Sequence, residues 1–204
     1  MSKNGKKTVC IIAEGSYPYI TGGVSSWIQD IISGLTDFNF IVLAISADED
    51  NELKYVLPEN VIRMEDRILK DDEKGKHNKI DKNFFSLIKE THKDMMYEKD
   101  FTKLEEVILH VHNNQYFYKD MLEHIESWNM ASEFGVKHNP MYAFSEYYWA
   151  WLASHKYLLK MLTWPIPEAD LYHTISTGYS GLFAAVAKIV LKKPVILTEH
   201  GLYN

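Results

Sequence analysis

The chain has 204 residues, of which 46% are hydrophobic and 25% charged, values typical of a globular protein and not of a disordered one. Its formal net charge of −6 argues against electrostatic binding of nucleic acid. Its single cysteine, Cys10, excludes an internal disulfide and fits a reducing cytoplasm. The apolar run near the N-terminus, residues 8–13, is too short for a signal peptide or a membrane span.

The first predicted elements are a buried strand, a loop with two adjacent glycines and a helix. Residues 8–13 are apolar and β-branched, and the apolar residues of 24–35 recur at spacings of three and four. Gly22 and Gly23 stand at the predicted helix start, where free backbone N–H groups and the helix dipole favour phosphate. The spacing matches neither the dinucleotide fingerprint nor the P-loop. A turn that serves only strand-to-helix geometry is therefore the alternative.

A long helical segment is predicted to interrupt the strands that follow. Residues 38–46 and, more weakly, 61–64 read as strands, with a short or missing helix between them, and the mixed charges of 70–82 indicate a solvated loop. Helical spacing then continues to a last helix at 143–162, which Pro165 and Pro167 end. We therefore expect an α-helical insertion over about 66–165. Its many aromatic side chains fit helix packing, or a platform on which sugar rings stack.

The nine histidines do not predict a metal site. His110 and His112 stand two apart on a predicted helix and so point to different faces. No cysteine or carboxylate stands near them at the spacing of zinc ligands.

The strand pattern resumes after the insertion and completes a parallel sheet. Residues 170–175 and 194–198 read as strands, 176–181 as a loop and 182–191 as a helix. Right-handed crossovers then favour a doubly wound α/β sheet in the order 3-2-1-4-5. The loops 14–24 and 176–181 leave the two strands between which the winding reverses, and the turn 199–201 opens onto the same edge. This arrangement predicts a crevice for a nucleotide or a phosphorylated sugar.

Both ends of the chain resemble a known enzyme family. Residues 14–19, 21–27, 172–181 and 198–203 closely resemble the amino-terminal domain of PelF-type glycosyltransferases, which belong to glycosyltransferase family 4 and serve Pel exopolysaccharide synthesis. The middle of the chain matches only in being a helical insertion. The resemblance implies the amino-terminal, Rossmann-like half of a GT-B fold. It further implies a metal-independent, retaining transfer from a nucleotide sugar, such as a UDP-sugar, without a cofactor.

The resemblance also assigns roles to particular residues. It makes His200 the catalytic residue beside the donor sugar and brings Gly22 and Gly23 to the donor phosphates. The expected substrate-cleft residues are Tyr17, Tyr19, His173, Thr177, Gly178, Tyr179 and Glu199. The donor-binding, carboxy-terminal domain of the family has no counterpart in this chain, so we expect a single domain over 1–204 that is inactive by itself.

The expected partners are a nucleotide sugar and a carbohydrate acceptor, in the cytoplasm or at the inner face of the membrane. Contact with a membrane polysaccharide synthase or export complex would run through partner proteins. A non-catalytic module that binds carbohydrate or a partner through the aromatic insertion is the alternative. A nucleotide-sensing, receiver-like domain has less support, because no acidic pair follows the first strand to bind magnesium.

Overall fold

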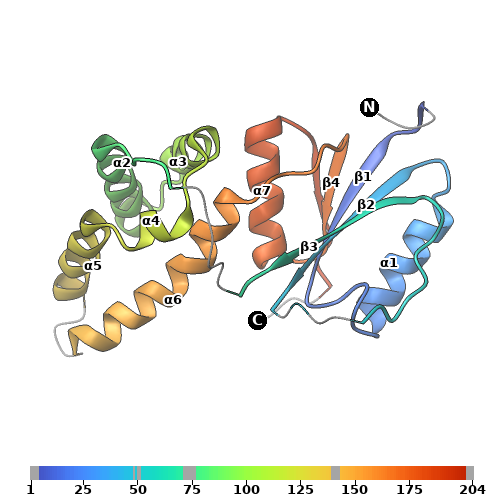
Figure 1. Ribbon diagram of the computed structural model, residues 1–204, viewed down its shortest axis with the longest axis horizontal. Helices are drawn as coiled ribbons and strands as arrows, with labels where there is room; N and C mark the ends of the chain where they lie inside the picture. The colour runs from blue at the N-terminus through green and yellow to red at the C-terminus, as the bar shows by residue number, and fades with distance from the viewer. Residues whose placement is uncertain (1–4, 48, 50–51, 71–76, 139–142, 201–204) are drawn as a thin grey trace. The chain divides into compact units, whose positions relative to one another are not determined.

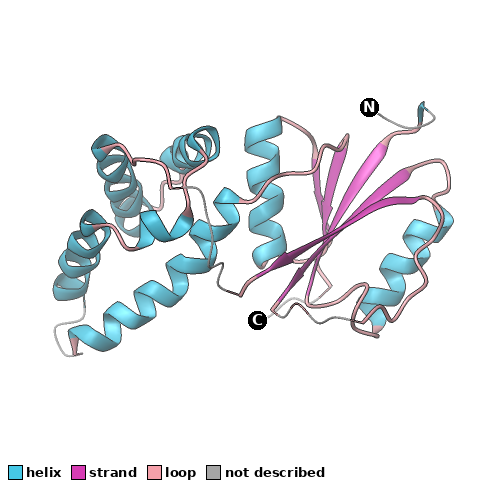
Figure 2. Cartoon of the chain, viewed as in Figure 1, coloured by secondary structure: helices cyan, strands magenta, loops and turns pink. Residues whose placement is uncertain are grey.

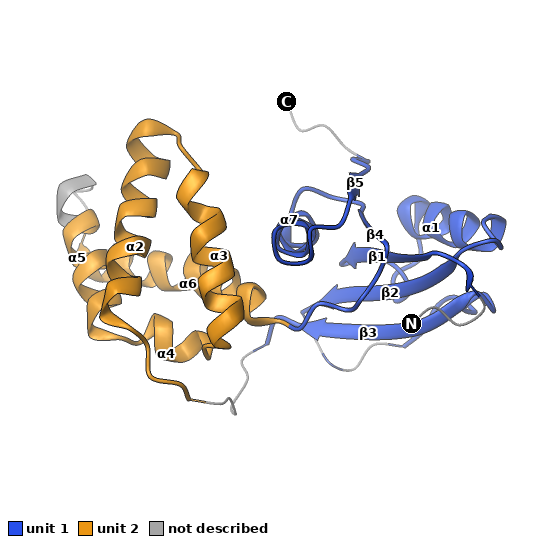
Figure 3. Ribbon diagram, turned by 90° about the horizontal axis from the view of Figure 1, so that it is seen from above, with its two compact units in different colours: residues 1–71, 165–204 blue, residues 72–164 orange. Residues whose placement is uncertain are grey.

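The structure is a computed structural model that describes residues 5–47, 49, 52–70, 77–138 and 143–200. It divides into two compact units, residues 1–71 with 165–204, and residues 72–164 (Figure 3). Figure 2 shows that the first unit combines a sheet with helices, whereas the second is helical. The helical unit falls within the range that the sequence predicts for the insertion.

The sheet of the first unit has five parallel strands in the order β3-β2-β1-β4-β5, which confirms the predicted topology (Figure 1). The strands are β1 (Thr8–Glu14), β2 (Asn39–Ser46), β3 (Val61–Ile68), β4 (Leu171–Thr174) and β5 (Val195–Leu197). β1 and β2 are buried over almost their whole length, as continuous apolar runs in a parallel sheet require. β3 runs to Ile68, past the end that the sequence predicts at residue 64. The prediction stops too early because the charged residues of the strand mask its apolar pattern.

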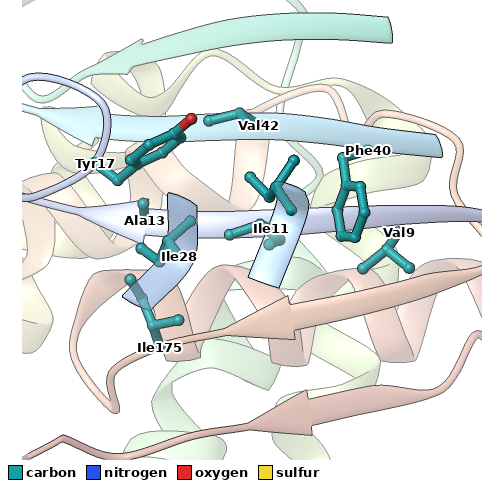
Figure 4. Close-up of a cluster of buried hydrophobic side chains, with 9 residues drawn as sticks. Val9, Ile11, Ala13, Tyr17, Ile28, Phe40, Val42 and Ile175 are labelled. Carbon is teal, nitrogen blue, oxygen red and sulfur yellow. The ribbon is translucent and has the colours of Figure 1, made fainter. Parts of the chain in front are cut away.

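Two helices cover this sheet, α1 (Gly23–Gly34) on one face and α7 (Tyr179–Leu191) on the other (Figure 1). α1 buries Ile28 and Ile32 completely against β1 and β2. Figure 4 shows the resulting core, which contains Val9, Ile11, Ala13, Tyr17, Ile28, Ile32, Phe40, Val42 and Ile175. The apolar spacing of the α1 sequence therefore marks the face that holds the helix on the sheet.

The connection from β2 to β3 contains no helix among residues 47, 49 and 52–60, the part of it that the structure describes. One residue of this connection instead caps the carboxyl end of α1. The Asn60 amide nitrogen donates to the carbonyl oxygens of Ile32 (2.8 Å) and Leu35 (3.2 Å) at the carboxyl end of α1. These carbonyls have no partner within the helix, so Asn60 satisfies them and fixes the helix end.

The second unit packs its helices around aromatic side chains. Its elements are α2 (Lys82–Lys93), the π-helical turn η2 (Asp94–Glu98), α3 (Thr102–Asn114), α4 (Tyr118–Leu122), α5 (Ile125–His138) and α6 (Phe144–Thr163). Tyr116, Tyr118 and Trp151 are at most 6% exposed, so core packing accounts for them. Trp128 and Trp149 are 42% and 68% exposed and are not explained in that way. No helix in the described part of the chain is both long and apolar enough to cross a bilayer.

Candidate functional site

Two loops leave neighbouring strands of the sheet at the same edge. β1 pairs in parallel with β4, so the loop after Glu14 and the loop after Thr174 both start at the carboxyl ends of their strands. The first loop begins with Gly15, whose φ of +56° lies in the left-handed region that glycine adopts without strain. It then turns through hydrogen bonds from the Tyr19 and Ile20 N–H groups to the Ser16 carbonyl. The predicted crevice edge is therefore formed by two loops that are distant in sequence.

The Glu14 carboxylate joins these loops by capping α7. The residue before the helix is Gly178, which has no side chain to cap it, and Glu14 Oε2 accepts from the Ser180 N–H at 3.0 Å. Ser176 Oγ lies 3.5 Å from the same oxygen. A Cβ added to Gly178 would come within 2.7 Å of it. Glycine at 178 thus lets a carboxylate from β1 reach a helix that starts more than 160 residues later.

Two imidazoles lie at this edge, and both contact one indole. The Trp27 ring meets the His173 ring edge-on at 5.9 Å and the His200 ring at 4.7 Å, measured between centroids. His173 Nε2 is 2.8 Å from the Thr198 hydroxyl. Burial and the neighbouring His200 lower the pKa of His173, so its imidazole is neutral at pH 7. His200 is exposed and is held by an aromatic contact instead.

Glu199 ties the loops after β4 and β5 together. Its Oε2 accepts from the Thr177 N–H at 3.1 Å, while its side chain stays exposed. His173, Thr177, Gly178, Glu199 and His200 therefore gather at one edge of the sheet. This group can offer imidazole nitrogens, a carboxylate and a hydroxyl group to a ligand.

The amino end of α1 lies at the same edge and is not capped by a side chain. Gly22 precedes the helix without a capping group, and its N–H makes one long contact of 3.4 Å to the Tyr55 hydroxyl. A Cβ added to Gly22 or Gly23 would meet nothing within 4 Å. Both glycines are exposed. The helix start is thus open to a molecule that would accept its N–H groups.

The three predicted tyrosines occupy different surroundings. Tyr17 is completely buried in the core beside Ala13 and Val42 (Figure 4), and its hydroxyl donates to Gln29 Oε1 at 2.7 Å. Burial and the nearby Tyr55 raise its pKa to about 12. The structure therefore puts Tyr17 under the loop, where it anchors the turn, and not in a ligand-accessible cleft.

Tyr19 and Tyr179 are both half-buried. The Tyr19 hydroxyl donates to the Asp66 carboxylate on β3, and burial together with that bond raises its pKa. Tyr19 is thereby turned toward the β3 side of the sheet. Tyr179 is the first residue of α7 and so lies next to Gly178.

Sequence reasoning missed three residues that organise this edge, Glu14, Trp27 and Thr198. Glu14 could have been found from the sequence, because it is a charged residue directly after the buried apolar run of β1. Trp27 fits the apolar face of α1, so its contacts with two imidazoles are invisible in the sequence. Within the described residues, no group of three or more His, Cys, Asp or Glu side chains is placed to hold a metal ion.

Comparison with known proteins gives one family. A family model described as "Domain of unknown function (DUF3492)" matches residues 7–204. No curated protein and no solved structure gives a significant match.

Proposed function

The chain belongs to the DUF3492 family, and from its site we propose that it is the acceptor-side, amino-terminal domain of a retaining nucleotide-sugar glycosyltransferase. The resemblance of both chain ends to PelF-type enzymes makes Pel-type exopolysaccharide synthesis the proposed setting. In this proposal Gly22 and Gly23 contact the donor phosphates, a second domain supplies the rest of the donor site, and the donor is a UDP-sugar. The enzyme would act in the cytoplasm or at the inner face of the membrane, with no metal or other cofactor.

One observation carries the proposal. The loops after β1 and β4 leave adjacent parallel strands, and His173 and His200 both contact Trp27 at the same edge. A doubly wound sheet binds its ligand where the winding reverses, which is between these two strands. The polar groups that meet there suit a ligand with both sugar hydroxyls and phosphate.

The reaction needs two kinds of stabilisation that this edge can provide. The bond between the anomeric carbon and the diphosphate breaks, the acceptor oxygen bonds to that carbon, and the acceptor proton leaves with the diphosphate. The uncapped N–H groups after Gly22 and Gly23 would stabilise the departing negative charge. His200, oriented by Trp27, would hydrogen-bond the sugar at the reacting carbon.

A glycine pair in α1 offers a matched test on the chain itself. Gly23 and Gly34 begin and end the helix, and a Cβ at either meets nothing within 4 Å. Isothermal titration with UDP should therefore show weaker binding for Gly23→Ala, by about tenfold, because the methyl group blocks close approach to the N–H groups. Gly34→Ala should bind UDP like the unchanged protein. Equal binding by both variants would count against a phosphate site at the start of α1.

The parent enzyme provides the test of catalysis. His200→Ala should lower turnover by about 100-fold or more while leaving the thermal midpoint unchanged, because His200 is exposed and removing it opens no cavity. Turnover is measured with a UDP-sugar and an oligosaccharide acceptor. Activity retained in His200→Ala would reject the role proposed for this imidazole.

A second candidate function rests on the exposed aromatic rings of the helical unit. Trp128 contacts Tyr148 at 4.5 Å and Trp149 lies beside the same tyrosine at 6.4 Å, while both indoles stay exposed. Such rings can stack on sugars, which favours a non-catalytic carbohydrate-binding module. Titration with oligosaccharides and with UDP-sugars separates the two functions. A pure carbohydrate module would bind the oligosaccharides, lose that binding in Trp149→Ala and ignore the nucleotide.

A further inference from the structure

A second opening lies along β3 and reaches the amino end of β1. It is a cavity of about 880 Å³, lined entirely by residues of the α/β unit. Thr8, the first residue of β1, lines this cavity, whereas Glu14, the last, belongs to the candidate site. Six steps along a strand separate the two residues by about 20 Å. None of the residues assigned to the candidate site lines this cavity, so the two sites are distinct.

Three alternate residues of β3 form a charged ladder in the cavity wall. Arg63, Glu65 and Arg67 project from the same face of the strand because side chains alternate. Glu65 Oε1 lies 2.7 Å from Arg63 and its Oε2 lies 2.5 Å from Arg67, so one carboxylate serves two guanidinium groups. The ladder carries one uncompensated positive charge. Glu65 and Arg67 are only 10% and 13% exposed, whereas Arg63 is 59% exposed and presents its guanidinium to solvent.

Arg67 also keeps an unused donor. It donates to the carbonyl oxygens of Pro165 (2.9 Å) and Asp66 (3.1 Å), which fastens β3 to the segment that leads into β4. Its Nε is buried and has no hydrogen-bond partner among the residues that the structure describes. Buried donors of a guanidinium are normally satisfied, so this atom is an exception within the wall of the cavity.

The remaining charged residues add to the positive character of the cavity. Lys7 is paired with Asp170 at 3.0 Å. Lys193 is exposed, and its charge, like that of Lys7, helps to lower the pKa of the Asp170 carboxyl. In total five basic and three acidic residues line the cavity, in a protein whose net charge is −6. Such a concentration of cations on an acidic chain attracts anions.

From these observations we propose that the cavity binds a phosphorylated small molecule. Arg63 and Lys193 supply the exposed cations for the phosphate, and the guanidinium of Arg63 suits the geometry of phosphate oxygens. The apolar side chains of Ile41, Ile166 and Pro167 in the wall offer contact to a non-ionic part of the ligand. The volume lies in the range of small-molecule sites. The proposal does not depend on glycosyl transfer at the other edge.

Titration with inorganic pyrophosphate, followed by backbone amide chemical shifts, tests the proposal and identifies the site. Saturable shifts are expected at the amides of Lys7, Arg63 and Lys193. Arg63→Gln combined with Lys193→Gln should weaken this binding at least about tenfold, because two charge-assisted contacts are lost. Lys188→Gln is the matched control, since Lys188 is an exposed lysine of α7 outside the cavity and should leave binding unchanged. If the double variant fails to fold, Lys193→Gln alone should weaken binding by several-fold.

Three results would overturn the proposal. They are the absence of any shift, shifts confined to Gly22 and Gly23, and equal pyrophosphate binding by the double variant and the unchanged chain. Shifts at Gly22 and Gly23 report on the candidate glycosyltransferase site alone. The two proposals can therefore fail independently.

Discussion

Acidification should destabilise the helical unit through a half-buried pair of imidazoles. His155 Nε2 lies 3.1 Å from His92 Nε2, and His155 Nδ1 lies 2.8 Å from the Trp151 carbonyl. A carbonyl only accepts, so Nδ1 of His155 carries the proton and its Nε2 accepts from His92. Both rings are neutral in this arrangement. Burial, followed by the nearby His92, lowers the pKa of His155 from 6.5 to about 4.

The size of the effect follows from this pKa difference. In the unfolded chain His155 titrates near 6.5, so between pH 6.5 and pH 4 the unfolded state binds more protons than the folded one. Stability is therefore complete above this window and falls as the pH decreases through it. The His155 contribution alone removes about 2 kcal/mol at pH 5 and about 3 kcal/mol at pH 4. Burial lowers the pKa of His92 as well, which acts in the same direction.

Urea unfolding at pH 7 and pH 5, followed by far-ultraviolet circular dichroism, measures the effect. His155→Phe is the informative variant, because phenylalanine keeps an aromatic ring over Trp151, which stacks on His155 at 4.3 Å, but cannot bind a proton. The loss of unfolding free energy between pH 7 and pH 5 should be about 2 kcal/mol smaller in the variant. Carboxylates titrate equally in both proteins and cancel in the comparison. The same pH dependence in both proteins would refute the argument.

The α/β unit allows two further predictions, both measured as unfolding free energies in urea. Gly178→Ala should cost about 1–2 kcal/mol, because its Cβ displaces the Glu14 carboxylate from α7, whereas Gly34→Ala has open space and should be neutral or slightly stabilising. An equal response to both glycine substitutions would show that Glu14 does not cap the helix. Ile28→Ala should cost about 3 kcal/mol since the side chain is completely buried, and Ile20→Ala, at a position 55% exposed, should cost less than about 0.5 kcal/mol. Similar losses at the two isoleucines would contradict the packing of α1 on the sheet.

The sheet was predictable because its central strands carry a strong local signal. β1 and β2 are buried on both faces, so each must be a continuous apolar run, and such runs are visible in sequence without knowledge of their neighbours. The strand order followed from the handedness of the crossovers. The end of β3 was missed since Glu65, Asp66 and Arg67 are charged. Arg67 finds its Pro165 carbonyl partner only once β3 lies beside the segment that leads to β4.

The candidate site was less predictable, because its contacts join residues far apart in the chain. The sequence offers no way to decide which aromatic residue of the loop after β1 faces inward. Hydrogen bonds to the Ser16 carbonyl turn the loop so that Tyr17 enters the core and Tyr19 reaches Asp66. In the same way, Trp27 is indistinguishable from a core residue of α1 until β5 brings His200 against it.

The two glycine loops of the site differ in what their helices can accept. At α7 a carboxylate from β1 already occupies the helix start, so the positive end of this helix is neutralised within the protein. At α1 the corresponding position after Gly22 has no side-chain cap and is exposed. An anionic ligand would be repelled by Glu14 at the start of α7 and attracted by the uncapped N–H groups at the start of α1. If the proposed transfer takes place here, the diphosphate must therefore lie at Gly22 and Gly23, and the loop around Gly178 is left to contact the sugar.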